Sequence, residues 1–181
     1  MNAWKQKRSV MRRYDSTATI YNARYAEEQE VKYKTALERV KPKGTVLDLG
    51  CGTGLFLDQI FADAERVVGI DLSRKQLITA RKHSNIMTRV DLVQADAENL
   101  PFKANSFDVV YAFTVLQNLS KPSFALKETV RIAKPRRSIV ITGLKKVFSA
   151  PSFESLLLSS GLRLTRMIDE ASLNCYIAVV H

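Results

Sequence analysis

Short runs of apolar residues alternate along this chain with longer stretches of mixed apolar and polar residues. The apolar runs are rich in Val, Ile and Leu, which is typical of buried strands. Five of them are the expected strands of a parallel sheet: residues 45–49, 66–70, 89–95, 107–112 and 138–142. Two further runs near the end, residues 162–168 and 174–180, are short and branched, and we expect them to pair antiparallel.

The mixed stretches predict helices between the strands. Residues 26–40 place Tyr33, Leu37 and Val40 on one helical face, and Pro42 and Gly44 end that helix. Pro122 stands in the first turn of its expected helix with Ser120 as the cap, and Gly161 ends the last helix. After the first helix, the expected helices cover residues 55–62, 74–83, 122–133 and 151–160.

Strands that alternate with helices predict an α/β fold. We expect a three-layer sandwich around a seven-stranded, mostly parallel sheet with an antiparallel final strand pair. The length of 181 residues fits a single domain over residues 1–181. Within it, residues 1–40 are expected to form an N-terminal cap segment and residues 41–181 the core.

Composition agrees with a globular protein, because 46% of the residues are hydrophobic and 25% are charged. No stretch approaches the roughly 20 apolar residues that span a bilayer, so no membrane association is expected. The opening residues Met-Asn-Ala-Trp-Lys-Gln-Lys-Arg lack the apolar run of a signal peptide. The sequence therefore predicts a cytoplasmic protein.

Cysteine and histidine are scarce. The chain has two cysteines, Cys51 and Cys175, and two histidines, His83 and His181. A structural zinc site uses four such ligands, so we expect no metal site within this chain. A Ser-His-Asp triad is also disfavoured, because His83 lies in a charged stretch and His181 is the last residue.

The formal net charge of +10 is the unusual global feature. The excess of Lys and Arg gathers in three clusters that contain no acidic residue: residues 1–13, 74–89 and 131–146. Such clusters can hold phosphate backbones, as in nucleic-acid binding. They are equally compatible with solvated helix faces, so charge alone leaves both interpretations open.

Three glycines at alternate positions, Gly50, Gly52 and Gly54, follow the first apolar run. Glycine there lets the backbone turn sharply and lets a ligand lie against bare main chain. The next expected strand ends in Asp71, and an acid at that tip can accept both hydroxyls of a ribose. Together these features favour a nucleoside-containing cofactor. Taken alone, the glycines also fit a tight turn, and Asp71 fits a helix N-cap for which Ser73 competes.

The spacing decides which cofactor is expected. A dinucleotide fingerprint is Gly-x-Gly-x-x-Gly, and from Gly50 its third glycine falls at Leu55. The pattern present is Gly-x-Gly-x-Gly preceded by Asp48, which is expected to orient the loop. At this point the chain resembles the class I, Rossmann-like S-adenosylmethionine-dependent methyltransferases, the group with ubiquinone-type and several RNA methyltransferases. The resemblance covers residues 14–181 and includes the segments 94–102, 106–116 and 126–135.

The resemblance implies S-adenosylmethionine as the cofactor. It implies that Asp96 accepts the adenine amino group, that Ala97 offers its backbone N–H, and that Phe113 lies along the methionine part or the transferred methyl. The N-terminal cap closes over the cofactor in relatives, which makes Tyr21 a cofactor neighbour. The full set of implied cofactor-binding residues is Tyr21, Asp48, Gly50, Cys51, Gly52, Gly54, Asp71, Leu72, Asp96, Ala97 and Phe113.

Tyr14, Arg24, Gln117 and Asn118 are the residues expected to position the substrate. Methyltransferases that act on amino nitrogen commonly show Asn/Asp-Pro-Pro-Tyr/Phe after the fourth strand, whereas this chain has Phe-Thr-Val-Leu at 113–116. An exocyclic amine is therefore disfavoured as acceptor. Carbon-5 chemistry through a cysteine adduct is disfavoured as well, because no cysteine stands there. An oxygen, a ring nitrogen, a carbon acid or a thiol remains open.

Several substrates fit the resemblance. The basic clusters favour tRNA or rRNA, and Arg136-Arg137 adds charge where relatives have Gly-Gly, so that loop must turn without glycine. A quinone-like small molecule is the alternative, and it predicts activity untouched by loss of residues 1–13. A protein substrate and a cofactor-binding scaffold without activity are further alternatives. The third strand is expected at the sheet edge, where a small zinc-binding activator protein is the expected partner.

Overall fold

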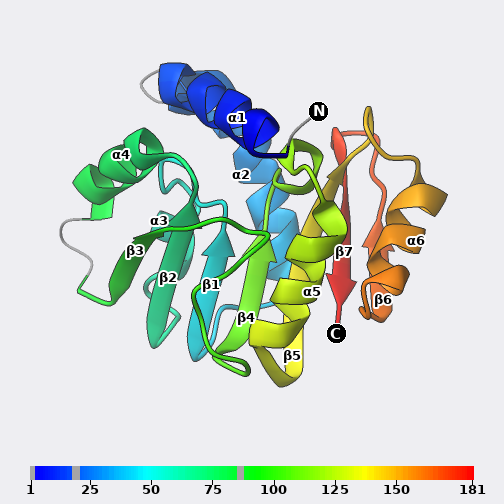
Figure 1. Ribbon diagram of the computed structural model, residues 1–181. Coiled ribbons are helices and arrows are strands. Elements are labelled where there is room, and N and C mark those ends of the chain that lie inside the picture. Colours follow the sequence, from blue (N-terminus) through cyan, green and yellow to red (C-terminus); the bar gives the residue numbers. More distant parts are fainter. Residues whose placement is uncertain (1–2, 18–20, 85–87) are drawn as a thin grey trace.

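A computed structural model gives the backbone of residues 3–17, 21–84 and 88–181 and the side chains of residues 4–15, 28–82 and 88–181. Seven strands form one sheet in the order β3-β2-β1-β4-β5-β7-β6 (Figure 1). Strands β1 to β5 are parallel, and β7 runs antiparallel to both β5 and β6. The predicted sheet is confirmed, including β3 at one edge. The strands are β1 (Thr45–Leu49), β2 (Arg66–Asp71), β3 (Val90–Gln94), β4 (Phe107–Ala112), β5 (Ala133–Leu144), β6 (Leu164–Ile168) and β7 (Cys175–Val180).

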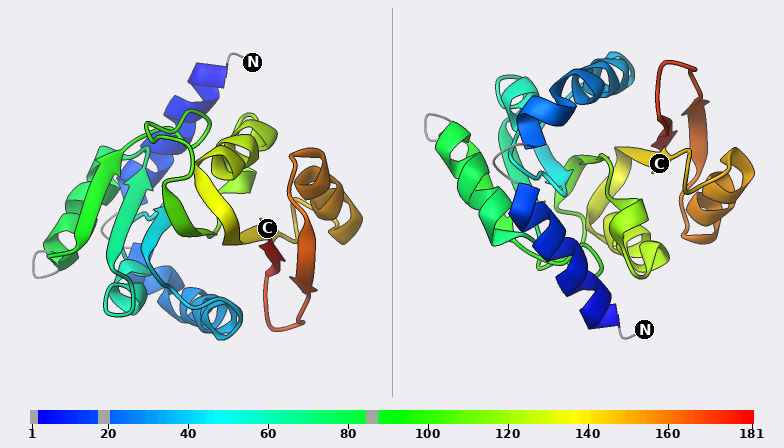
Figure 2. Two further views of the ribbon diagram at one scale, coloured as in Figure 1. Left: turned by 90° about the horizontal axis from the view of Figure 1, so that it is seen from below. Right: turned by 90° about the horizontal axis from the view of Figure 1, so that it is seen from above.

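Helices cover both faces of the sheet and complete three layers (Figures 1 and 2). Alternation along each strand supplies both faces with apolar side chains. In β4, Val109 and Tyr111 join the core beneath α2, α3 and α4, whereas Val110 and Ala112 join the core beneath α5 and α6. The helices are α2 (Tyr21–Arg39), α3 (Leu57–Ile60), α4 (Arg74–Ser84), α5 (Pro122–Ile132) and α6 (Ala150–Ser159), with a 3-10 turn η1 (Leu116–Asn118).

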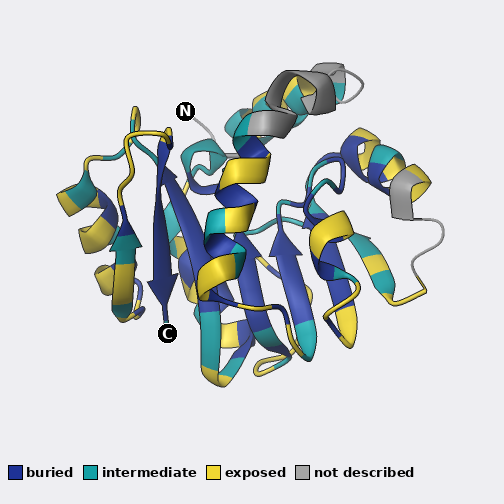
Figure 3. Cartoon of the chain, turned by 180° about the vertical axis from the view of Figure 1, so that it is seen from behind, coloured by how far each residue is buried: buried dark blue, intermediate teal, exposed yellow. Residues whose placement is uncertain are grey.

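A helix that the sequence analysis did not predict, α1 (Ala3–Thr17), lies across the carboxyl ends of the parallel strands (Figures 1 and 2). The sequence predicts only a basic cluster within the cap for this segment. The predicted apolar face of the following helix is confirmed, because Tyr33 and Val40 are buried and Leu37 packs partly buried against them. Viewed from behind, α2 crosses the buried centre of the sheet with its outer side exposed (Figure 3). No helix among the described residues is long and apolar enough to cross a membrane.

The helix expected from residue 26 begins five residues earlier, at Tyr21. Two further predicted boundaries were wrong for local reasons. The helix expected from residue 55 begins only at Leu57, because a tight turn comes first, in which the N–H of Leu57 donates to the carbonyl oxygen of Gly54 over 3.0 Å. The strand expected at 138–142 begins at Ala133 and contains Arg136 with a φ of +61°. The Arg136-Arg137 segment therefore does turn without glycine, and the pairing register shifts between Phe107 and Val109 on β4.

One buried hydrogen bond ties α2 to the centre of the sheet. The Tyr111 hydroxyl donates to the carbonyl oxygen of Val40, just past the end of α2, over 2.7 Å. Burial raises the pKa of the Tyr111 phenol, which therefore stays a neutral donor. Tyr111 also packs edge-on against Phe56, with ring centroids 4.8 Å apart. The bond fixes the helix that forms one side of the site described below.

Replacing Tyr111 by Phe is expected to lower the free energy of unfolding by about 1–3 kcal/mol, because a buried carbonyl loses its donor. Urea denaturation measures the change. Tyr176→Phe is the matched control, since the hydroxyl of that buried tyrosine bonds to no residue whose side chain is described. Equal losses in the two variants would contradict a specific role for the Tyr111 hydroxyl.

Candidate functional site

A cavity of about 120 Å³ opens at the carboxyl ends of β1, β2, β3 and β4, beneath α1. Ligand sites of open parallel sheets lie at this edge, because the strand order reverses there and leaves a crevice. In this sheet β1 lies between β2 and β4. The chain adds β2 and β3 on one side of β1 and then crosses over to add β4 on the other side. The cavity is lined by the loop after β1, the tips of β2 and β4, the loop after β3, and residues from α1 and α2.

The glycine loop is bonded to β2. The backbone N–H groups of Gly50 and Cys51 both donate to the carbonyl oxygen of Ile70, each over 2.8 Å. Gly50, Gly52 and Gly54 have φ values of +78°, +55° and +88°, which favour glycine at all three positions. A Cβ on Gly50 would meet Val115 at 2.5 Å, whereas a Cβ on Gly52 would meet no atom closer than 3.7 Å. Gly50 therefore serves packing, while Gly52 leaves bare backbone at the cavity for a ligand.

Asp71 connects two loops at the tip of β2. Its carboxylate accepts the N–H of Gly52 over 3.0 Å and the N–H of Ser73 over 2.8 Å. Ser73 is the cap of α4, because its hydroxyl accepts the N–H of Gln76 over 3.1 Å. Burial raises the pKa of Asp71, and the two backbone bonds oppose that rise. Asp71 lines the cavity beside Leu72.

Asp48 lies on the cavity floor with its carboxyl group almost fully buried. Its Oδ2 atom has no hydrogen-bond partner among the described residues. Burial, with a smaller contribution from Asp71, raises the pKa of Asp48 to about 8. Burial likewise raises the pKa of the Cys51 thiol, with Asp48 and Asp71 adding to the effect, so Cys51 is a neutral lining residue. The floor can therefore accept a cation, because a cation would favour the ionised carboxylate.

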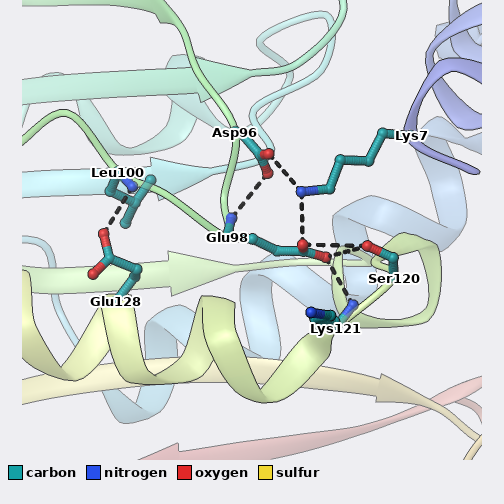
Figure 4. A network of polar contacts seen from close by, with 7 residues as sticks. All are labelled: Lys7, Asp96, Glu98, Leu100, Ser120, Lys121 and Glu128. Carbon is teal, nitrogen blue, oxygen red and sulfur yellow. Dashed lines mark hydrogen bonds and ion pairs between the residues drawn. The ribbon is translucent and has the colours of Figure 1, made fainter. Parts of the chain in front are cut away.

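A lysine of α1 reaches the loop that follows β3 (Figure 4). Lys7 Nζ lies 2.6 Å from a carboxylate oxygen of Asp96 and 2.6 Å from one of Glu98. Burial by itself lowers the pKa of Lys7, but the hydrogen bonds to these two carboxylates raise it overall. Asp96 also accepts the N–H of Glu98 over 3.0 Å. The carboxylate expected to receive the adenine amino group is thus held by α1.

Glu98 corrects one prediction about α5. The hydroxyl of Ser120 does not cap that helix; it donates to Glu98, and the N–H of Lys121 also donates to Glu98 over 2.8 Å. Burial raises the pKa of Glu98, but Lys7, Lys121 and Ser120 together lower it below its usual value. Glu98 and Lys7 were missed by the sequence analysis. Only the position of Glu98 two residues after Asp96 was available as a signal.

Tyr14 and Asn118, two expected substrate-positioning residues, meet at the cavity. Asn118 Nδ2 donates to the Tyr14 hydroxyl and to the carbonyl oxygen of Thr114, each over 2.9 Å. Both residues line the cavity, as do Phe113 and Ala97. Gln117 is placed behind this surface, where its amide donates to Thr114 O over 2.7 Å. Gly54 also lies outside the lining.

A second set of contacts holds the carboxyl-terminal end of α1. The Asp15 carboxylate accepts a hydrogen bond from the Ser73 hydroxyl, and Gln76 Nε2 donates to Tyr14 O over 3.0 Å. Since Lys7 and Val10 line the cavity, loss of residues 1–13 would remove a wall of the site. For a small-molecule enzyme the structure therefore predicts a loss of activity on this truncation, in contrast to the expectation from the sequence. Tyr21 and Arg24 belong to α2 but lie outside the residues whose side chains are described.

The residues present fit the expected cofactor. Bare backbone at Gly52, the Asp71 carboxylate, the unpartnered Oδ2 of Asp48 and the Asp96–Ala97 loop lie around one cavity. Phe113 closes its apolar side and packs with Tyr33 and Phe56, with ring centroids 5.0 and 4.7 Å away. The carboxylates can accept hydrogen bonds from the hydroxyl and amino groups of S-adenosylmethionine, and the aromatic rings can contact its methyl group.

Comparisons with known proteins identify the family of the chain. The family profile described as a methyltransferase domain matches residues 47–141, more than half of the chain. A demethylmenaquinone methyltransferase of Clavibacter sepedonicus is 34% identical over 128 residues, which cover 71% of this chain and 52% of that protein. A malonyl-[acyl-carrier protein] O-methyltransferase of Marinomonas sp. is 30% identical over 153 residues, which cover 81% of this chain and 55% of that protein. The chain thus spans a little over half the length of these curated relatives.

Solved structures share the fold. A SAM-dependent methyltransferase from Aquifex aeolicus superposes with a TM-score of 0.73 at 22% identity, covering 82% of this chain and 88% of that one. A Haloferax volcanii protein, described as a putative methyltransferase in complex with the Trm112 methyltransferase activator, reaches a TM-score of 0.84 at 19% identity, covering 94% and 96%. The motif order, the sheet and the family match lead to one conclusion: the chain belongs to the methyltransferase domain family, within the class I S-adenosylmethionine-dependent methyltransferases.

Proposed function

We propose that this protein transfers the methyl group of S-adenosylmethionine to a small organic molecule bound beneath α1. The observation that carries the proposal is the cavity itself. It joins the glycine loop, Asp71 and the Asp96–Ala97 loop on one side with Phe113 and the Tyr14–Asn118 pair on the other. The curated relatives that act on demethylmenaquinone and on the malonyl-[acyl-carrier protein] support a substrate other than nucleic acid.

Each cofactor role is assigned from the chemistry of the residue. Asp71 would accept the ribose hydroxyls, and Asp96 with the Ala97 N–H would recognise adenine, while Gly52 leaves room for close approach. Asp48 would face the cationic part of the cofactor from the floor of the cavity. Leu72 and Cys51 would supply apolar contacts from the same lining.

S-adenosylmethionine supplies an electrophilic methyl on a positively charged sulfur. The protein must then align the acceptor and keep water away. The first task falls to Tyr14 and Asn118, which hold each other at the cavity and have polar atoms on one surface. The second falls to α1 above and to the packed rings of Tyr33, Phe56 and Phe113 on one side.

The placement of charge favours a small molecule. Arg136 and Arg137 lie near the amino-terminal end of β5. Because β5 is parallel to β4, this end of the strand points away from the cavity. Three other basic residues of that cluster are paired: Arg131 with Glu128, Lys134 with Asp108, and Lys145 with Asp169. Lys7 is likewise bonded within the protein. These four basic residues of the clusters are therefore held in ion pairs within the protein.

RNA remains the second candidate because of one surface. Lys5, Arg8 and Arg12 are exposed on α1, with a spacing that puts them on one helical face. Helix α1 contacts α4, on which Arg81 and Lys82 are exposed. These charges flank the cavity end of the molecule, where a phosphate backbone would need them.

A partner at the β3 edge is retained as part of this proposal. β3 is the last strand on its side of the sheet, so one of its backbone edges is available for strand addition. The Haloferax volcanii neighbour is described in complex with an activator protein. A small zinc-binding activator is the partner we propose for this edge.

Labelled S-adenosylmethionine, supplied to the purified protein with small-molecule, RNA and protein fractions, is expected to label the small-molecule fraction. Adding cell extract in parallel tests the activator, since label that appears only with extract points to a partner. Ribonuclease-sensitive label would favour RNA instead. Label in the protein fraction would favour a protein substrate, and binding without transfer to any fraction would favour a scaffold.

Asp71→Ala is expected to weaken S-adenosylmethionine binding on the order of 10- to 100-fold, because a charged hydrogen-bond acceptor is lost and Gly52 is released. Isothermal titration calorimetry measures the affinity. Asp91→Ala on β3 is the control, since that carboxylate is half-exposed and pairs only with the exposed Arg66 among the described residues. Unchanged affinity in Asp71→Ala would contradict the proposed pose.

Cofactor binding is expected to release a proton from Asp48. Its pKa of about 8 keeps the empty site protonated near neutral pH, and a bound cation lowers that pKa. The affinity for S-adenosylmethionine should therefore rise between about pH 6 and pH 8, since protons compete with the cation below the raised pKa. Calorimetry in buffers of different ionisation enthalpy counts the protons. Asp48→Asn should release none from this site; equal release by both proteins would refute the role.

A further inference from the structure

Lys32 on α2 is a lysine buried in the interior, with 1% of its surface exposed. Its ammonium group has three hydrogen-bond donors and no acceptor. Nζ lies 3.1 Å from Thr114 Oγ1, 3.3 Å from Gln29 Oε1 and 3.6 Å from Glu28 Oε1. The two closer partners, Thr114 and Gln29, both line the cavity. The ammonium therefore lies directly behind the wall of the proposed methyl-transfer site.

This arrangement is costly for a purely structural position. Removing an ammonium group from water is costly in free energy. A carboxylate that is partly exposed and lies at a longer distance offsets only part of that cost. Glu28 is such a partner, with 36% of its side chain exposed. Cys175 on β7 does not supply a negative charge to Lys32. Burial raises the pKa of the Cys175 thiol more than the nearby Lys32 lowers it, so the thiol stays neutral. Lys145, which also acts on Cys175, is paired with Asp169. The positive charge of Lys32 is thus left under-compensated toward the cavity.

Thr114 is held in a strained conformation that presents it to the cavity. Its φ is +59°, which is unfavourable for a β-branched residue. The strain is held by bonds on both sides of the peptide: its N–H donates to Thr142 Oγ1 over 2.7 Å, and its carbonyl oxygen accepts from Gln117 and Asn118. Strain maintained by this many contacts marks a side chain whose direction matters.

The Lys32 contact fixes what the Thr114 hydroxyl can do. Since an ammonium group only donates, Thr114 Oγ1 is the acceptor in that bond. The hydroxyl proton must therefore point elsewhere, and no described residue accepts it. A lysine that donates to the oxygen also polarises the O–H bond and makes it a stronger donor. Thr114 can thus donate a hydrogen bond into the cavity.

The position of Thr114 favours the acceptor over the cofactor. The glycine loop is bonded to β2, through Ile70 and Asp71. Thr114 is bonded in the other direction, to Thr142 on β5 and to Lys32 on α2. Phe113, the residue before Thr114, also lines the cavity. The Thr114 hydroxyl therefore belongs to the part of the lining that is held by α2 and β5 and not by β2.

We propose that Thr114, with Lys32 as its positioning residue, forms an oxyanion site for the methyl acceptor, whose substrate class is a phenol or enol that binds as its anion. This inference rests on the proposed methyltransferase function and selects between the acceptors left open by the sequence. The hydrogen bond and the ammonium group together stabilise the oxyanion at the pH of the cell. The acceptor then enters the reaction already deprotonated, so no general base is required.

The probe is 4-nitrophenol, whose anion is yellow and whose neutral form is colourless. Protein saturated with S-adenosylhomocysteine is titrated with the probe at several pH values, and absorbance reports the ionisation state of the bound probe. We expect the bound probe to ionise at a lower pH than the free probe. Lys32→Met should weaken binding of the anion about tenfold or more, as expected when a charged hydrogen-bonding group is lost. Lys32→Arg should restore most of that loss, and binding of the neutral form should change little.

A second pair of variants separates the hydroxyl from the fold. Thr114→Val keeps the branched shape and removes the donor, whereas Thr114→Ser keeps the donor. We expect Val to lose the preference for the anion and Ser to retain it. This pair leaves the buried charge in place, so it decides the question even where Lys32→Met fails to fold. Thermal unfolding of every variant is measured alongside.

Three results would overturn the inference. Absence of probe binding, or binding without preference for the anion, removes the oxyanion site. Equal behaviour of Thr114→Val and Thr114→Ser removes the hydroxyl from it. Weakened binding of S-adenosylhomocysteine by Lys32→Met, with 5′-methylthioadenosine binding unchanged, assigns the charge to the amino acid part of the cofactor. If the wild-type protein binds no S-adenosylhomocysteine, the proposed function itself fails and the inference falls with it.

Discussion

The buried carboxylate of Asp71 holds together the parts on which the site depends. It receives the N–H of Gly52 from the loop after β1 and the N–H of Ser73 at the start of α4. Without these bonds, three left-handed glycines would leave the loop with many alternative conformations. The carboxylate therefore fixes the direction of the loop and the position of α4, and α4 in turn holds α1 through Gln76.

From this anchor the cavity is closed by contacts between distant segments. Helix α1 is bonded at one end to Ser73 and Gln76. At the other end Lys7 is bonded to Asp96 and Glu98 (Figure 4). Glu98 extends the connection to the first turn of α5 through Lys121. Loops that follow three different strands are thereby held by one helix. A ligand that displaces Lys7 from Asp96 would also affect the bond to Glu98, because the lysine bridges the two carboxylates.

The electrostatic character of the site differs between its two sides. Asp48 and Asp71 place buried carboxyl groups on the cofactor side, where the raised pKa of Asp48 makes the charge depend on what is bound. Lys32 places a buried positive charge behind Thr114, in the part of the lining that α2 supplies. A cationic cofactor and an anionic acceptor would each meet the favourable charge. Attraction between opposite charges in a poorly solvated cavity is stronger than in water, so this separation can orient both ligands.

The sheet, the order of its elements and the glycine loop could all be predicted from the amino-acid sequence. These features follow from local properties: apolar runs of strand length, amphipathic stretches between them, and glycines where φ is positive. Arg136 shows what such local properties do not predict. Because relatives have glycine there, we expected a turn at Arg136, but not a residue of positive φ inside a twelve-residue strand. Tertiary structure alone decided the role of Lys7, 89 residues from Asp96, and of Lys32, 82 residues from Thr114. It also decided that Arg136 and Arg137 lie at the sheet edge opposite the cavity. A charge pattern records which residues are basic, whereas their partners depend on which segments the packed sheet brings together.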